Sequence, residues 1–272
     1  MMINSISVKD FNLQHTLECG QFFRFVKHNG WYYIGHRNKL FKVKQKGNRL
    51  LYSNITETFL KRFFNLDFDY DRIFKKTRNK HISKARNQFK GLRLIKQDPW
   101  ECLISYVCSA NNNIPKIKKM IAQLCKEFGR KVKLDEVIMY SFPAPGKLNS
   151  KNKIKNCVYT GVKTKSILEI NKKMNSSRLN QLKKQSYQTA LNKLTQLYGV
   201  GPKIANCVML FSLDFLEAVP VDIHMKKVLV KKYSLVDACD TRLTSKAMNC
   251  FGKYGGIFQQ YLFYQQRIKD KD

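Results

Sequence analysis

The chain has 272 residues, of which 43% are hydrophobic, so it can bury a sizeable core in one or two domains. Its 51 lysines and arginines against 19 aspartates and glutamates give a formal net charge of +32, spread along the whole sequence. Such a field favours polyanionic partners, nucleic acid first and an anionic membrane surface second. No stretch approaches the run of about 18 apolar residues that a membrane helix needs, and the N-terminus lacks the apolar core of a signal peptide. We therefore expect an intracellular protein without a membrane partner.

Eight cysteines are spread along the chain without a CxxC pair, and most of them lie in apolar stretches with helical periodicity. This pattern is typical of buried free thiols in a reducing compartment. We expect neither a metal site nor a cofactor.

The N-terminal part of the chain is predicted to be rich in β-strands. A hairpin around Asn29-Gly30 is expected to join Gln21–Val26 to Trp31–Gly35, because Asn-Gly is a preferred tight turn between strands. The alternating stretch Leu40–Gln45 and its return over Leu50–Ser53 predict a second hairpin.

Farther along, the periodicity becomes helical. Asp98–Glu101 has the pattern of a helix start, with a capping aspartate, a proline in the first turn and a glutamate three residues on. The nearly all-apolar Cys102–Ala110 that follows is expected to lie at the centre of the core. The other helices are expected over Thr56–Phe64, Pro115–Phe128, Asp135–Tyr140, at least two stretches within 163–197, Pro202 to about Leu213, the residues after Asp222, and Ile257–Arg267, with loops over Pro143–Lys155 and Gly252–Gly256.

No linker-like stretch separates the two halves, so we expect them to pack together. The predicted fold class is α+β. An N-terminal antiparallel sheet domain, residues 1–80, is expected to pack on an all-helical region, residues 81–272, that contains a helix–hairpin–helix.

The segment Leu197–His224 carries the strongest local pattern. Two glycines flank Val200, so the chain can turn tightly there, and the following proline can open a helix whose free amides form an anion site. Lys203 then lies in the first helical turn, where the helix dipole favours an acid, so its placement suggests a role other than stability. Asp222, which follows a proline-containing loop, is expected to cap the next helix.

A helix–hairpin–helix with this lysine and this aspartate resembles the helix–hairpin–helix DNA glycosylase superfamily. Five motifs in the same order further resemble the 8-oxoguanine DNA glycosylase family, and they span most of the chain: Leu17–Arg24, Asp98–Leu103 with Cys108–Ile114, Gly199–Cys207, Val219–Met225, and Gly255–Phe263. The resemblance implies a bifunctional DNA glycosylase and AP lyase of base excision repair. Such an enzyme flips 8-oxoguanine out of duplex DNA, excises it through a lysine Schiff base and cleaves the strand by β-elimination. The implied partner is double-stranded DNA containing 8-oxoguanine, and the implied state is a monomer.

This chemistry suits two residues of the pattern. Excision of a base passes through an oxocarbenium-like state, which a nearby carboxylate stabilises. An amine that attacks the anomeric carbon then gives a covalent Schiff base. The amine must be neutral to attack, and the N-terminus of a helix disfavours its charged form. Lys203 is therefore the candidate nucleophile and Asp222 the candidate carboxylate.

The resemblance also assigns a base pocket. It implies that the carbonyl of Gly20 accepts the N–H that distinguishes 8-oxoguanine from guanine, and that Gln259 reads the Watson–Crick edge. Phe263, four residues later on the same predicted helix, would share its face and stack on the base. Cys207 and Pro220 would line the pocket. Without the resemblance, Phe263 and Cys207 are more typical of core packing.

Further residues are implied to contact the DNA. Asn111 would occupy the space that the flipped base leaves and meet the orphaned cytosine, although an asparagine there also suits a helix C-cap. His224 would contact one phosphate, and the amides of Gly199, Val200 and Gly201 would hold another.

Three positions depart from the family pattern. Lys116 stands near the arginine that reads the opposite cytosine, and a lysine cannot make the same bidentate contact. Val162 stands where the family has an aromatic residue that intercalates into the DNA, and Lys163 stands where the family has the arginine that follows it. The sequence therefore predicts relaxed discrimination of the base opposite the lesion.

Several alternatives remain open. An endonuclease III-type glycosylase shares Lys203 and Asp222 but usually carries four closely spaced C-terminal cysteines for an iron–sulfur cluster, whereas only Cys239 and Cys250 lie late in this chain. An alkylbase glycosylase would lack the lysine. A non-enzymatic helix–hairpin–helix DNA-binding module would leave Asp222 and Gln259 without roles. The sequence also leaves the compartment open, with DNA association expected in a eukaryotic nucleus or in a prokaryotic cytoplasm or nucleoid.

Overall fold

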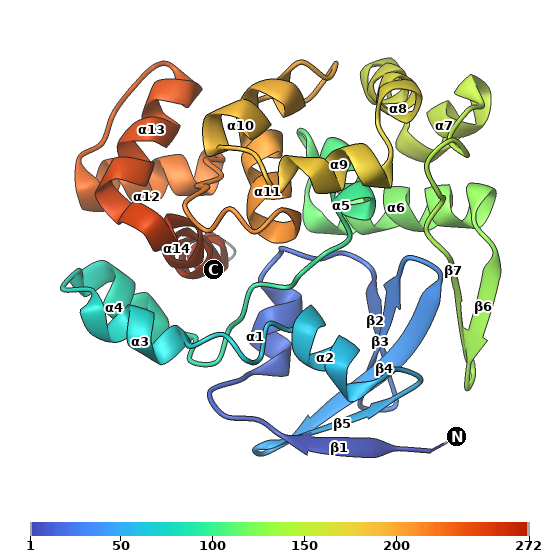
Figure 1. The fold of residues 1–272 in the computed structure, drawn as a ribbon, viewed down its shortest axis with the longest axis horizontal. Helices are drawn as coiled ribbons and strands as arrows, with labels where there is room; N and C mark the ends of the chain where they lie inside the picture. Colours follow the sequence, from blue (N-terminus) through green and yellow to red (C-terminus); the bar gives the residue numbers. More distant parts are fainter. Residues whose placement is uncertain (1, 271–272) are drawn as a thin grey trace.

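The computed structural model describes residues 2–270, in which an antiparallel sheet lies on one side and most of the helices on the other (Figure 1). The α+β class is confirmed. The five strands of the sheet have the order β1-β5-β4-β3-β2, and a separate two-stranded sheet pairs β6 with β7. The strands are β1 (Asn4–Ser7), β2 (Phe25–His28), β3 (Trp31–His36), β4 (Lys39–Lys46), β5 (Arg49–Ser53), β6 (Lys131–Leu134) and β7 (Val137–Tyr140).

Most of the remaining chain is helical, and α14 lies beside both α12 and α4. Within residues 2–270, none of them combines the length and the apolar character that a membrane crossing requires. They are α1 (Leu13–Glu18), α2 (Glu57–Phe63), α3 (Tyr70–Lys76), α4 (Lys80–Gln88), α5 (Pro99–Ser109), α6 (Ile114–Phe128), α7 (Lys151–Val158), α8 (Gly161–Lys173), α9 (Ser176–Leu182), α10 (Tyr187–Thr195), α11 (Pro202–Ser212), α12 (Ile223–Tyr233), α13 (Asp240–Phe251), the 3-10 turn η1 (Gly252–Tyr254) and α14 (Gly255–Lys269).

Both predicted hairpins of the sheet are confirmed. β2 pairs with β3, and β4 pairs with β5. Asn29 and Gly30 have φ angles of +49° and +73°, the left-handed conformation that a tight hairpin turn requires. β2 begins only at Phe25, because the preceding Gln21 is buried and bonded to a distant part of the chain instead. The edge strand β1 and the helix α1 were not predicted.

The short helix predicted over Asp135–Tyr140 is wrong. β6 and β7 form a hairpin there, and Asp135 lies at its turn with a φ of +51°. The Asp135 carboxylate accepts hydrogen bonds from the Tyr33 hydroxyl at 2.7 Å and from Lys42 Nζ at 2.6 Å. Contacts with the main sheet therefore fix this turn. The periodicity of the local sequence does not reveal contacts with residues so far away in the chain.

The two predicted loops are also partly wrong. α7 begins at Lys151, inside the stretch predicted to be a loop, because Ile154 and Val158 bury one helical face. The last helix begins at Gly255 rather than Ile257, since Gly255 and Gly256 pack closely against neighbouring segments.

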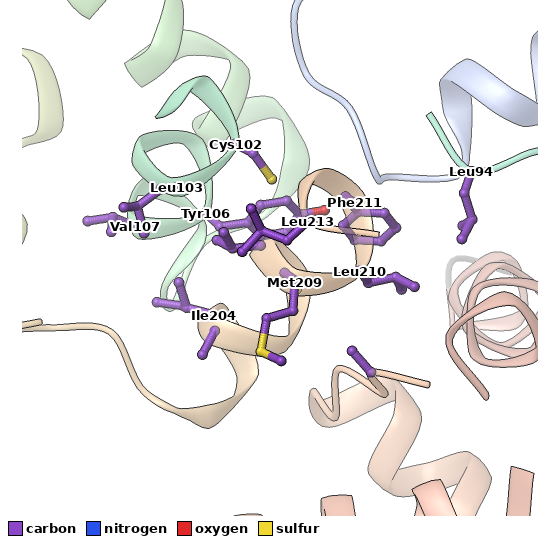
Figure 2. Packing of buried hydrophobic residues seen from close by; sticks show 14 of the residues in the cluster. Leu94, Cys102, Leu103, Tyr106, Val107, Ile204, Met209, Leu210, Phe211 and Leu213 are labelled. Carbon is purple, nitrogen blue, oxygen red and sulfur yellow. The ribbon is translucent and has the colours of Figure 1, made fainter. Parts of the chain in front are cut away.

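Helices α5 and α11 pack on each other in the core of the helical region (Figure 2). All eleven residues of α5 are buried, and Asp98 caps its N-terminus as predicted, with Oδ1 accepting from Glu101 N at 3.0 Å. The rings of Tyr106 and Phe211 stack with centroids 5.6 Å apart. The two helices run antiparallel, so the last turn of α5 lies beside the first turn of α11.

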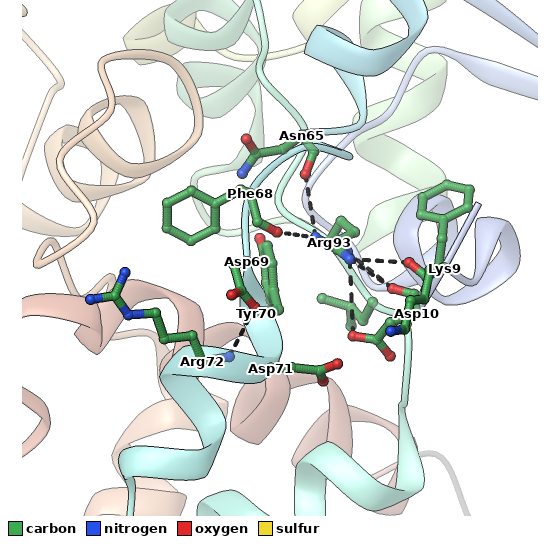
Figure 3. Close-up of polar contacts among 12 residues, drawn as sticks. Lys9, Asp10, Asn65, Phe68, Asp69, Tyr70, Asp71, Arg72 and Arg93 are labelled. Atoms are coloured by element: carbon green, nitrogen blue, oxygen red, sulfur yellow. Dashed lines mark hydrogen bonds and ion pairs between the residues drawn. The ribbon is translucent and has the colours of Figure 1, made fainter. Parts of the chain in front are cut away.

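A buried arginine ties the segment between α4 and α5 to the start of the chain (Figure 3). Arg93 donates to the carbonyl oxygens of Asp10 at 3.0 Å and Phe68 at 2.5 Å. Its guanidinium lies 4.4 Å from the ring centroid of Tyr70. These bonds hold the sheet domain against α3 and the connection to α5.

We expect Gly256→Ala to lower the free energy of unfolding by about 1–3 kcal/mol. A Cβ at this position would lie 2.2 Å from Leu210 Cδ1 and 2.6 Å from the carbonyl oxygen of Ala218, and that backbone atom cannot simply move aside. The melting temperature, followed by circular dichroism, should fall by several degrees. Gly161→Ala is the control, because a Cβ there meets no atom within 4 Å, and its melting temperature should not fall. Equal melting temperatures for the two variants would contradict the close packing of α14.

Candidate active site

A cavity of about 510 Å³ opens between the sheet domain and the helices. It is bounded by the loop after α1, the last turn of α5, the start of α6, α11, the entry to α12 and α14. Eight residues predicted for the site line it together: Gly20, Lys203, Cys207, Pro220, Asp222, His224, Gln259 and Phe263. The fold therefore joins residues more than two hundred positions apart in one cavity.

Lys203 lies in the first turn of α11, which begins at Pro202 after the N-cap Gly201. Its amine is partly exposed to the cavity, and Nζ donates to Ser109 Oγ at 3.1 Å. The same Nζ lies 5.3 Å from the ring centroid of Tyr106. Neither contact was predicted, because Ser109 and Tyr106 are separated from Lys203 by more than ninety positions.

Asp222 caps α12, as predicted. Its Oδ1 accepts from Met225 N at 2.9 Å, and the carboxylate lines the cavity that contains Lys203. Among the described residues Asp222 forms no ion pair with Lys203, whose hydrogen-bond partner is Ser109. The carboxylate is thus free to face a positive charge that arises inside the cavity.

The opposite wall of the cavity begins at Gly20, which has a φ of +93°. A Cβ there would lie 3.1 Å from Ile114 Cδ1 and 3.4 Å from Phe263 Cε1, so both the conformation and the space favour glycine. Arg267, which the sequence did not indicate, lies just beyond and donates to the carbonyl of Glu18 at 2.5 Å. Burial lowers the pKa of this guanidinium.

Hydrogen bonds of Gln21 fix the loop that contains Gly20. This side chain is fully buried, with Oε1 accepting from Ile95 N at 2.8 Å and Nε2 donating to the carbonyls of Arg93 at 2.7 Å and Thr16 at 2.9 Å. The Gln21 carbonyl in turn accepts from the Tyr106 hydroxyl at 3.0 Å. The loop is therefore fixed on both the sheet side and the α5 side.

Gln259 and Phe263 share one face of α14, as their spacing predicted. Gln259 is 3% exposed, and its Oε1 has no hydrogen-bond partner among the described residues. A buried unpaired acceptor is unfavourable unless a ligand satisfies it. Phe263 is partly exposed to the cavity and can present a flat apolar face.

Cys207 is 3% exposed, one helical turn after Lys203. Burial raises the pKa of its thiol to about 12, although the charge of Lys203 acts in the opposite direction. The thiol therefore stays protonated near neutral pH and forms an uncharged part of the cavity wall.

His224 is held by a carboxylate that the sequence did not indicate. Its Nδ1 lies 2.6 Å from Asp270 Oδ2, and its ring meets Phe263 edge to face with centroids 5.8 Å apart. Lys227 Nζ and Gln266 Nε2 also donate to Asp270, at 3.0 Å and 2.8 Å. These donors, Lys227 first, hold the pKa of the Asp270 carboxyl well below its usual range.

The helix–hairpin–helix turn lies outside the cavity lining. Gly199 has a φ of +78°, and a Cβ there would clash with Ser166, so glycine is required for packing against α8. The amide of Val200 donates to the carbonyl of Leu197 at 3.0 Å and is already used within the turn. Gly201 is exposed at the N-terminus of α11.

The remaining predicted residues also lie outside the cavity lining. Asn111 is exposed just after α5 with a φ of +52°, and Lys116 is exposed in the first turn of α6. Val162 is 64% exposed, whereas Lys163 is only 9% exposed. Most of the Lys163 side chain is therefore buried, which the sequence did not indicate.

The chain is similar to known proteins in both its sequence and its fold. A family model described as the N-terminal domain of 8-oxoguanine DNA glycosylase matches residues 3–103. An N-glycosylase/DNA lyase of Saccharomyces cerevisiae is 28% identical over 268 residues, with 85% of this chain and 70% of that protein covered.

The 8-oxoguanine glycosylase/lyase of Clostridium acetobutylicum has a similar structure. Its apo-form gives a TM-score of 0.88 and 31% identity, with 97% of this chain and 98% of that chain covered. Its complex with double-stranded DNA containing cytosine opposite 8-oxoG gives 0.90 and 30%, with 99% of each chain covered. The match extends over both the sheet and the helices, so this chain belongs to the 8-oxoguanine DNA glycosylase family and is an N-glycosylase/DNA lyase.

Proposed function

We propose that this enzyme excises 8-oxoguanine from duplex DNA and then cleaves the strand through a Schiff base on Lys203. The observation that carries the proposal is that Lys203 and Asp222 line the same cavity as Gly20, Gln259 and Phe263. One wall offers an amine and a carboxylate, and the other offers groups suited to a purine.

The base has to leave the helix stack to reach this cavity. Phe263 would stack on the flipped base, and the unpaired Oε1 of Gln259 would accept a hydrogen bond from its Watson–Crick edge. The Gly20 carbonyl would accept the N7–H that 8-oxoguanine has and guanine lacks. This last contact would supply the specificity, because guanine would leave the acceptor unpaired.

Excision breaks the bond between the base and the anomeric carbon, and the electron pair leaves with the base. Asp222 would stabilise the positive charge that develops on the sugar. The neutral Lys203 amine would then bond to the same carbon and lose a proton, and opening of the sugar ring would give the Schiff base. Loss of the neighbouring C2′ proton and departure of the 3′ phosphate would complete β-elimination.

The surface around the cavity would bind the DNA. Exposed Asn111 would fill the vacated position, and the Nε2 that His224 leaves free would reach a phosphate. The exposed amides of Gly199 and Gly201 would hold a second phosphate. We further propose that the chain acts as a monomer, without a cofactor, wherever the cell keeps its DNA, and that residues 1–80 and 81–272 form its two domains.

The first test is borohydride trapping on a duplex that contains 8-oxoguanine. We expect a covalent adduct with the wild-type chain and its complete loss in Lys203→Gln, because the trapped bond is formed by that amine. Lys61→Gln is the matched control, since Lys61 pairs with Glu57 on α2 in the sheet domain, and it should trap normally. If the chain releases oxidised pyrimidines or alkylated bases but not 8-oxoguanine, the proposed substrate is wrong. Binding without release of any lesion would indicate a non-enzymatic DNA-binding module.

The second test concerns the base opposite the lesion. A bidentate contact from an arginine to the opposite base would be worth about 1–3 kcal/mol of discrimination, and Lys116 offers only a point charge. We therefore expect the excision rates opposite the four bases to lie within about tenfold of one another. Lys116→Arg should raise the preference for cytosine, whereas Lys119→Arg, also exposed on α6, should not. A steep cytosine preference in the wild-type chain would contradict this prediction.

The third test concerns the neutral wall formed by Cys207. Alkylation by iodoacetamide needs a thiolate, so Cys207 should remain unmodified in the folded protein at neutral pH. Cys239 should react first, because it is partly exposed and the backbone amides of Arg242 and Thr241 lower the pKa of its thiol. Mass spectrometry of peptides after timed alkylation measures both rates. Modification of Cys207 as fast as Cys239 would show that a thiolate is present in the cavity.

A further inference from the structure

The last turn of α5 presents a hydroxyl to the Lys203 amine. Ser109 is 7% exposed, and its Oγ lies 3.1 Å from Lys203 Nζ. The same Oγ lies 2.7 Å from the carbonyl oxygen of Tyr106, to which it donates. Ser109 lines the same cavity, and none of the roles proposed above uses it.

The direction of these two bonds determines what Ser109 can do. A serine hydroxyl has one proton and two lone pairs. Since the proton is directed at the Tyr106 carbonyl, the oxygen can only accept from Lys203 Nζ. A neutral amine that donates an N–H to Ser109 keeps its own lone pair free, and that lone pair has to reach the sugar carbon.

The amine needs such a partner because a lysine side chain has four rotatable bonds and loses considerable entropy when it is held in one position. Asp222 does not hold it, as the Asp222 Oδ1 caps α12 and no ion pair joins the two residues in the described part of the chain. Nζ also lies near the face of the Tyr106 ring, which attracts a cation but does not fix the direction of an N–H as a hydroxyl oxygen does.

We infer that Ser109 is a positioning residue for the nucleophilic amine of Lys203. The inference rests on the proposed function. Its support is rigid, because Tyr106 stacks on Phe211 and its hydroxyl donates to the carbonyl of Gln21. The turn that presents the hydroxyl is therefore the turn that also holds the loop of Gly20, which fixes the amine relative to the base side of the cavity.

The test compares Ser109→Ala with the wild-type chain in single-turnover reactions on a duplex containing 8-oxoguanine and on one containing a preformed abasic site. Misplacement of a reacting group by about 1 Å can lower a rate by about 100-fold, so we expect trapping by borohydride to slow by about 10- to 100-fold on both duplexes. The Kd for a duplex with a non-cleavable abasic analogue should stay within about twofold, because Ser109 holds the amine and not the DNA.

Ser212→Ala is the matched control. Ser212 is also buried, at 2% exposure, and its hydroxyl also donates to a carbonyl within its own helix, at 2.6 Å, but Ser212 lies at the other end of α11. Its trapping rate should equal that of the wild-type chain. Ser109→Cys fills the space of the side chain with a slightly larger atom and replaces the oxygen with a weak acceptor. It should also trap slowly, which tests the inference even if the alanine variant fails to fold.

The outcomes separate the inference from the function on which it rests. Trapping at the wild-type rate by either Ser109 variant overturns the positioning role and leaves the proposed function intact. Slow trapping accompanied by an equal loss of DNA affinity also overturns it, since that result indicates a general structural role. A wild-type chain that neither releases 8-oxoguanine nor traps DNA overturns the proposed function itself.

Discussion

The antiparallel packing of α5 on α11 is the contact on which the site depends. It sets the last turn of one helix against the first turn of the other, so that Ser109 and Tyr106 meet Lys203. Both helices are mostly apolar, all of α5 and most of α11 are buried, and a close-packed interior allows little sliding of one helix against the other. The position of the Lys203 amine is thus set by the packing of side chains farther along the same two helices, such as Tyr106 on Phe211 (Figure 2).

The sheet domain brings the other half of the site and is joined to α5 by polar contacts. Arg24 and Glu101 form a buried ion pair at 3.1 Å, and Gln21 bonds to the segment that leads into α5. The desolvation cost of a buried pair offsets most of its attraction, so its main effect is on geometry, and removal of one partner would leave a buried charge. These contacts account for the glutamine and the arginine that follow Gly20 in the first motif, since both hold its loop against the helices.

Local rules predicted the parts of the site that depend on one helix end or one helix face. The positions of Lys203 and Asp222 follow from a glycine turn and an N-cap. Gln259 and Phe263 were singled out by the family resemblance, and helical spacing predicted that they share one face of α14. Ser109, Gln21 and Asp270 were missed because their roles depend on partners 94, 74 and 46 positions away. The β6–β7 hairpin was mistaken for a helix for the same reason, since four-residue strands carry too little periodicity and distant side chains fix the turn.

The charges around the cavity are consistent with the proposed reaction, in which a cation exists only transiently. The chain has a strongly positive field that attracts DNA, yet the cavity itself contains a carboxylate, Asp222, without a paired cation among the described residues. Burial raises the pKa of the neighbouring Cys207 thiol to about 12, so the thiol adds no second negative charge to the cavity. Ser109 accepts from the amine without any charge of its own. Under the proposed function, Asp222 would face the positive charge on the sugar, while Ser109 would hold the amine that attacks the same carbon.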